Sequence, residues 1–304
     1  MSSGAQREAT GLRIAVPFLI VALIWGSTWF VILGQNDLAP TAWSVTWRFA
    51  LATPAMFVTT LAMGRTLRIG RGGHWLALIV GLTQFCGNYN FVYRAEEHLT
   101  SGIVATMIGL MLVPNAILAR VLLGQPITRR FAIGSAIALA GIALLLLHEA
   151  HDAPAGGNVV LGIVFAATAM LCASVSNVVQ ANDTGRALPM VSLLSWAMLY
   201  GTLIDGALAW VISGPPVFPT SAAYWLGTGY LAILGTVVTF PLYYTLIRQI
   251  GAGKAAYNGV AVVVIAMLIS TLLEGYRWSP LAVAGAAFAT VGLMVALSAR
   301  RPAA

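Results

Sequence analysis

The chain has 304 residues, of which 59% are hydrophobic and only 8% are charged, whereas soluble domains average about 25% charged residues. So few charges cannot cover the surface of a water-soluble protein, and much of the exterior must therefore face lipid. The formal net charge of +7 does not indicate a nucleic-acid partner. The basic residues sit in short clusters between long apolar runs, which is the pattern of the positive-inside rule.

The apolar runs have the length of transmembrane helices, which need about 20 mostly apolar residues. We predict ten spans, at residues 14–34, 41–63, 75–94, 99–122, 130–148, 158–181, 188–212, 223–247, 254–274 and 280–299. The connections between them leave no room for a soluble domain. The sequence thus predicts an all-α integral membrane protein whose surroundings are the lipid bilayer.

The basic residues set the expected orientation. If the N-terminus is cytoplasmic, thirteen of the sixteen Lys and Arg residues fall in cytoplasmic segments. Two, Arg94 and Arg277, fall on the other side, and Arg48 lies within the second span. Because this bias favours a cytoplasmic N-terminus and ten spans return the chain to the same side, we expect both termini in the cytoplasm.

A repeat relates the two halves of the chain. Shifting the sequence by 151 positions aligns Gly102 with Gly253, Gly134 with Gly285, Gly141 with Gly292, and Tyr93 with Tyr244. The period predicts two halves, residues 1–150 and 151–304, with five helices each. An odd number of helices inverts the second half in the membrane, which is the architecture of alternating-access transporters.

Several motifs carry a family resemblance across nearly the whole chain. They are Trp25-Gly26-Ser27-Thr28, Arg48-Phe49, the run from Pro114 through Leu123-Gly124 to Gly134 and Gly141, Ile265-Ala266-Met267, Ser270 to Gly275, Trp278, Gly285 and Gly292. With these motifs the sequence resembles the drug/metabolite transporter superfamily, in particular its ten-helix bacterial EamA-type exporters. The chain departs from that pattern at Gln125, where the family usually has Glu, and at Ile265, where it usually has Pro.

The resemblance implies a multi-pass transporter of the bacterial cytoplasmic (inner) membrane that exports a small molecule. Members are similar to exporters of amino acids, drugs and metabolites and to nucleotide-sugar exchangers, so the motifs do not select a substrate. Exchange or uptake within the same fold, and a membrane protein without transport activity, are the alternatives.

Charges inside the spans need a partner or a function, because an uncompensated charge at the bilayer centre costs about 2.5–3.5 kcal/mol on insertion scales. Arg48 and Asp205 lie at about the same depth in spans two and seven. Arg48 is expected to pair with Asp205, to bind an anionic group of the substrate such as a carboxylate, or to have a structural role near the outer interface. Possible proton coupling is assigned to Asp205 or Glu274, and Glu274 has Arg277 as an alternative partner.

Polar and aromatic side chains concentrate in a few spans, where lipid offers them no hydrogen bonds. We expect them to line a cavity between the halves that holds a small polar or aromatic molecule, or to act as interhelical hydrogen-bond partners. The candidate binding residues are Trp25, Thr28, Arg48, Gln84, Asn88, Tyr89, Tyr93, Asn177, Tyr244, Tyr257 and Asn258. Gln84 and Asn88 are four residues apart and therefore share one helix face.

Two prolines and two small-residue faces complete the membrane features. Pro114 and Pro241 lie within spans four and eight, where each removes a backbone hydrogen bond and predicts a kink that serves as a gate or is static. Gly134 with Ala138, and Gly285 with Ala289, favour close helix packing within one chain or between two. A monomer and a homodimer are both compatible with these faces.

No catalytic or cofactor site is expected. The cluster from His148 to Asp152 lacks the spacing of a helical zinc site, Ser101 has no immersed histidine as a base, and Cys86 and Cys172 have no ligand-like spacing. We therefore expect a secondary transporter of an amino-acid-like or small aromatic or polar metabolite rather than an enzyme.

Overall fold

The long apolar runs form helices, because a backbone within lipid must satisfy its hydrogen bonds internally. The computed structural model describes residues 3–124, 126–152, 158–250 and 257–297, with side chains at 13–124, 126–148, 158–243, 245–246 and 258–297. All elements in these ranges are helical. They are α1 (Ser3–Asn36), α2 (Thr41–Ala62), α3 (Gly70–Val80), the π-helix η1 (Gly81–Asn88), α4 (Tyr89–Glu96), α5 (Ser101–Gly109), α6 (Leu112–Leu123), α7 (Arg129–Asp152), α8 (Val159–Val179), α9 (Asp183–Ala187), α10 (Met190–Ser213), α11 (Ala222–Ala232), the π-helix η2 (Ile233–Val238), α12 (Thr239–Ile250), α14 (Tyr257–Leu273) and α15 (Pro280–Leu297).

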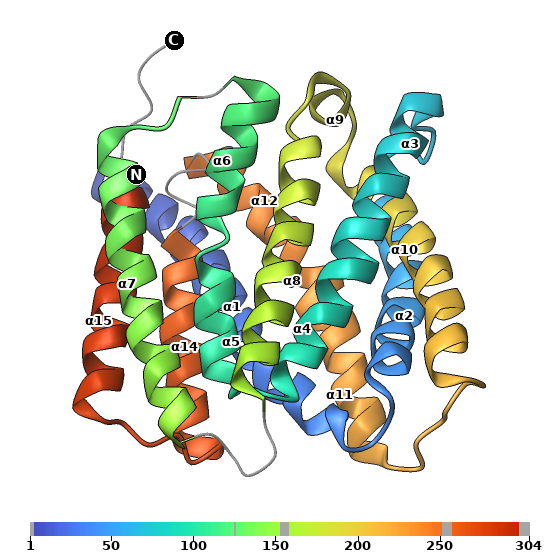
Figure 1. Cartoon of the computed structure of the whole chain (residues 1–304). Helices are drawn as coiled ribbons and strands as arrows, with labels where there is room; N and C mark the ends of the chain where they lie inside the picture. The colour runs from blue at the N-terminus through green and yellow to red at the C-terminus, as the bar shows by residue number, and fades with distance from the viewer. Residues whose placement is uncertain (1–2, 125, 153–157, 251–256, 298–304) are drawn as a thin grey trace.

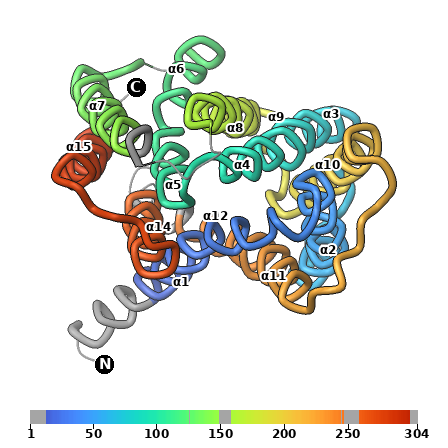
Figure 2. The backbone as a smooth tube through the Cα atoms, turned by 60° about the horizontal axis from the view of Figure 1, so that its bottom comes forward, coloured from blue at the N-terminus to red at the C-terminus, as the bar shows by residue number. Residues whose placement is uncertain are grey.

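The helices stand side by side, and α1 begins on the face where α15 ends (Figure 1). We call this the terminal face, and the face where α1 ends at Asn36 the opposite face. Figure 2 shows α1 crossing the middle, with α2, α3, α10 and α11 on one side and α5, α7, α14 and α15 on the other. Each side therefore combines helices from both halves of the sequence.

The exterior of the bundle is apolar. Val121, Val160, Val211, Leu226 and Leu272 are each at least 70% exposed, although they lie on five different helices. Within the described residues, seven helical segments are long and apolar enough to cross a membrane, and they coincide with the expected spans one, four, five, six, seven, eight and ten.

The other three expected spans fall on α2, on the continuous segment α3–η1–α4, and on α14. The first two are the more polar helices: α2 carries Arg48 with several Thr and Ser residues, and the second segment carries Gln84, Asn88, Asn90 and Glu96. The described part of α14 has 17 residues and is largely apolar, but it is too short for a spanning segment by length. α2 and α3–η1–α4 thus combine candidate polar residues with a weaker membrane signal.

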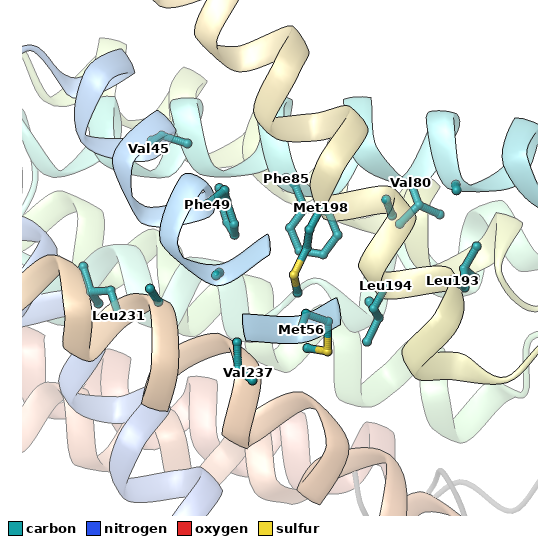
Figure 3. Packing of buried hydrophobic residues seen from close by; sticks show 14 of the residues in the cluster. Val45, Phe49, Met56, Val80, Phe85, Leu193, Leu194, Met198, Leu231 and Val237 are labelled. Atoms are coloured by element: carbon teal, nitrogen blue, oxygen red, sulfur yellow. The ribbon is translucent and has the colours of Figure 1, made fainter. Parts of the chain in front are cut away.

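The largest core cluster lies between α2, α3–η1, α10 and α11–η2. Phe49 and Met56 of α2 meet Phe85 of η1 and Met198 of α10, and Val237 of η2 closes the cluster (Figure 3). Four of these five side chains are fully buried at 0% exposure. This packing fixes α2 and η2 relative to each other.

The fourth expected span is broken in the middle. α5 ends at Gly109 and α6 begins at Leu112, two residues before Pro114. Proline has no N–H to donate to the carbonyl four residues earlier, and its ring displaces that carbonyl, which explains a break at this place. Pro241 lies in the first turn of α12, directly after η2, and interrupts no helix.

The small-residue faces pack against each other within the chain. A Cβ atom on Gly141 would lie 2.2 Å from the backbone nitrogen of Ala289, and one on Gly292 would lie 2.3 Å from that of Ala138. Gly134 and Gly285 make the matching contacts one or two turns away. The backbones of α7 and α15 are therefore in contact. The two small-residue faces pack against each other within one chain.

We expect Gly141→Ala to destabilise the protein by about 1–3 kcal/mol, because a methyl group at this site overlaps backbone atoms that cannot rotate away. The apparent melting temperature in detergent micelles measures this effect. Gly229→Ala is the matched control, since a Cβ atom there meets nothing within 4 Å. Equal melting temperatures for the two variants would contradict the proposed packing constraint.

Candidate functional site

The candidate site lies where α1 and α2 meet the π-helix η2. The Trp25 Nε1–H donates to the Gly235 carbonyl at 3.2 Å and to Thr239 Oγ1 at 2.8 Å. A Cβ atom on Gly235 would lie 3.0 Å from Thr28 Cγ2 and 3.6 Å from Arg48 Nη2. Glycine at this position lets the three elements approach, and the π-helical geometry displaces its backbone from α-helical register.

Arg48 occupies the centre of this site with only 2% of its surface exposed. Its guanidinium carbon lies 4.4 Å from the centre of the Tyr89 ring, a distance typical of a cation–π interaction. Nη2 donates a long hydrogen bond of 3.4 Å to Thr236 Oγ1. Nε and Nη1 are buried, and no described side chain or backbone atom accepts a hydrogen bond from them.

Asp205 is not the partner of Arg48. Its carboxylate is fully buried in α10 and accepts hydrogen bonds from Thr46 Oγ1 at 2.6 Å and from the Asn90 side-chain amide. Thr46 and Arg48 are two residues apart on α2 and so point in different directions. Of the alternatives for Arg48, the ion pair with Asp205 is wrong for the described structure, because neutral donors already satisfy this carboxylate.

A hydrogen-bonded lock joins α1, α4 and α11 near the opposite face; we define it as Gln35, Tyr93 and Thr228. The Tyr93 hydroxyl donates to Gln35 Oε1 at 3.1 Å, and Gln35 Nε2 donates to Thr228 Oγ1 at 2.7 Å. All three residues are buried, at no more than 2% exposure. Tyr93, which the sequence analysis expected to bind substrate, thus connects α4 to α1 through its hydroxyl group.

Glu274 caps α5. Its carboxylate accepts hydrogen bonds from the Ser101 backbone N–H at 3.2 Å, from the Ser101 hydroxyl and from the Ser270 hydroxyl at 2.9 Å. A negative charge at a helix N-terminus is stabilised by the backbone dipoles. The alternative pairing with Arg277 does not form among the described side chains.

The remaining predicted residues are spread over the bundle. Gln84 is half-buried and Asn88 is buried, and both lie in η1. Asn177 Nδ2 lies 3.5 Å from Met111 Sδ. Asn258 Nδ2 donates to the Phe18 carbonyl at 2.7 Å and connects α14 to α1.

The structure therefore brings together Trp25, Thr28, Arg48 and Tyr89, with the Tyr93 hydroxyl within electrostatic range of Arg48, and it places Asn177 and Asn258 elsewhere. The side chains of Tyr244 and Tyr257, and the whole of Gln125, lie outside the described residues.

Three residues of interest were missed by the sequence analysis: Gln35, Glu96 and Thr236. Thr236 lies in an apolar run, and only the π-helix turns it toward Arg48. Glu96 follows the expected end of span three at residue 94, but α4 continues to Glu96 and buries it at 3% exposure. A charged residue directly after a polar span was the available signal.

The EamA-like transporter family model matches the chain twice, over residues 13–147 and 160–298. The chain belongs to the EamA-like transporter family. Protein PagO of Salmonella typhimurium strain LT2 is 22% identical over 268 residues, covering 88% of this chain and 87% of PagO. The uncharacterized inner membrane transporter YedA of Escherichia coli strain K12 is 27% identical over 274 residues, covering 83% of this chain and 80% of YedA.

A solved crystal structure shares the fold, with a TM-score of 0.67 at 18% sequence identity and coverage of 92% of this chain and 95% of that one. Together with the apolar helices, the family and these relatives identify a multi-pass inner-membrane transporter. This EamA-family chain has its buried, incompletely paired arginine where α1, α2 and η2 meet.

We expect Tyr93→Phe to loosen the lock, because it leaves Gln35 Oε1 buried without a donor, at a cost of about 1–3 kcal/mol. Hydrogen–deuterium exchange should increase in the end of α1 and the first turns of α11. Tyr200→Phe is the control, since the Tyr200 hydroxyl bonds His74 Nδ1 elsewhere in the bundle. Unchanged exchange at α1 and α11 in Tyr93→Phe would show that the lock does not hold these helices.

Proposed function

We propose that this protein is a ten-helix secondary transporter that exports a small metabolite carrying a carboxylate, by alternating access of a site centred on Arg48. One observation carries the substrate class. Two guanidinium nitrogens of Arg48 are buried without acceptors, although an unpaired buried donor costs about 1–3 kcal/mol or more when charged. A carboxylate supplies the missing acceptors, and the adjacent Tyr89 and Trp25 rings favour an amino-acid-like or aromatic molecule.

The internal repeat supports two inverted halves. The π-helices η1 and η2 occupy matching positions under the offset of 151 residues, and α7 and α15 contact each other through reciprocal glycines. The family model matches once in each proposed half. Inverted repeats allow one half to take the conformation of the other, which exchanges access between the two faces.

The packing supports a state closed toward the opposite face. There the lock joins three helices, and α5 has seven buried residues among its nine. Toward the terminal face, α6 has no buried residue. Opening requires the lock to break while contacts form around α6, and the break before Pro114 separates α5 from α6.

The direct test is mass-spectrometric release from proteoliposomes that contain a mixed pool of amino acids, nucleosides, amines and organic acids, compared with protein-free vesicles. We expect protein-dependent loss of carboxylate-bearing species from the wild type. Adding the same pool outside distinguishes exchange from net export, because an obligatory exchanger releases its substrate only in that case. Release of amines or nucleosides alone would contradict the proposed substrate class.

We expect Arg48→Lys to reduce the initial rate of release at least about tenfold. Lysine loses the guanidinium contact with the Tyr89 ring and the spread of donor nitrogens. A single charged hydrogen bond contributes about 1.5–3 kcal/mol, and about 1.4 kcal/mol corresponds to a factor of ten. Arg68→Lys is the control, because Arg68 precedes α3 at the membrane surface. Normal transport by Arg48→Lys would exclude a specific role of the guanidinium group.

The proposed orientation, with both termini in the cytoplasm, predicts the outcome of alkaline phosphatase fusions. This enzyme needs disulfides, which form in the oxidising periplasm. We expect a fusion at the C-terminus to be inactive and a fusion after Pro216, in the connection following α10, to be active. The reverse pattern would show that the chain is inserted with its termini outside.

A further inference from the structure

The structure describes three carboxylates near the membrane-embedded polar groups, and two of them are satisfied. Asp205 accepts from Thr46 and Asn90, and Glu274 accepts from Ser101 and Ser270. Glu96 differs from both. Its side chain is 3% exposed, and neither Oε1 nor Oε2 has a hydrogen-bond partner among the described residues.

An ionised carboxylate without hydrogen bonds is costly in a buried site, and such a group reduces this cost by binding a proton. Of the ionisable side chains around Glu96, Arg48 of α2 and Glu274 at the end of α14 lie within electrostatic range. Besides α2, the elements that pack on α4 are α1, α5, α8 and η1. Their described parts present no carboxylate or cation close to Glu96. The ionisable side chains described on these elements are Arg13 at the far end of α1, Cys172 on α8 and Cys86 on η1.

The residues next to Glu96 in the sequence do not pair with it. Tyr93, one turn earlier on α4, belongs to the lock. Arg94 is half-buried, Glu97 is exposed, and the ring of His98 stacks on Phe165 with centroids 5.9 Å apart. No ion pair forms between these side chains and Glu96 within the described structure.

We propose that Glu96 is a proton-binding site of this transporter, linked electrostatically to substrate binding at Arg48. A proton from water on one face binds a Glu96 carboxylate oxygen, and it leaves to water on the other face after the conformational change. The linkage part of this proposal depends on the proposed function, whereas proton binding by Glu96 does not.

The charges fix the sign of the linkage. Ionised Glu96 and a substrate carboxylate are both attracted to the one cation, Arg48, and they repel each other. Binding of a carboxylate at Arg48 therefore favours protonated Glu96, and proton and substrate move in the same direction. With a more acidic exterior this coupling favours uptake, so net export requires a larger outward gradient of the substrate itself.

Infrared difference spectra of the protein in lipid bilayers, recorded between alkaline and acidic buffer, test the site without any substrate. We expect one component of the carboxylic-acid carbonyl band to be present in the wild type and in Glu97→Gln and to be absent in Glu96→Gln. Glu96→Asp, which keeps a carboxyl group, should retain a shifted band and serves if Glu96→Gln does not fold. A band that is unchanged in both Glu96 variants would overturn the proposal.

Release of the mixed pool under imposed pH gradients tests the linkage. An acidic interior should accelerate release of carboxylates by the wild type and Glu97→Gln, and in Glu96→Gln the ratio of rates with and without the gradient should fall to unity. Retained dependence in Glu96→Gln, no dependence in the wild type, or acceleration by an acidic exterior would overturn the linkage. If the wild type releases nothing, the proposed function fails, and the infrared band still decides whether Glu96 binds a proton.

Discussion

The constraint on which this structure depends is that polar groups within a hydrocarbon environment must find their partners in the protein. Asp205 illustrates it: a fully buried carboxylate is held by a threonine of α2 and an asparagine of α4, and so connects three helices. Gln35 does the same between α1, α4 and α11. Where this constraint is met, the polar group fixes helices in place. Arg48 and Glu96 are charged groups for which it is not met by hydrogen bonds among the described residues, and they are the groups proposed to bind the substrate and the proton.

The two π-helices help to position the residues of the proposed site. A π-helical turn contains an extra residue and shifts every later side chain around the helix axis. In η2 this shift, together with Gly235, presents Thr236 to Arg48 and the Gly235 carbonyl to Trp25. The site is therefore made by backbone geometry and close approach as much as by side-chain chemistry. Its equivalent, η1, carries Gln84 and Asn88 in the other half.

Contacts between the sequence halves hold the bundle together. α7 packs on α15 through glycines and α2 packs on α10 around Phe49, Phe85 and Met198, so neither half forms a separate body. In the proposed alternating-access mechanism, this interlocking requires both halves of the sequence to move at once. In that proposed mechanism it also couples the lock at one face to α6, which has no buried residue, at the other.

The sequence by itself determined the solvent, the helical class and the family, because a charge content of 8% and long apolar runs depend only on composition and order. It also identified Trp25, Thr28, Arg48 and Tyr89 as candidates, because polar and aromatic groups in apolar spans are expensive unless used. Only the tertiary structure decided their partners. Asp205 accepts hydrogen bonds from Thr46 and Asn90 rather than from Arg48, and Tyr93 bonds Gln35 in the lock. Glu96 lies buried beyond the expected end of its span. Depth along a helix follows from the sequence, whereas rotation about its axis and the choice of neighbour follow from π-helical turns and packing.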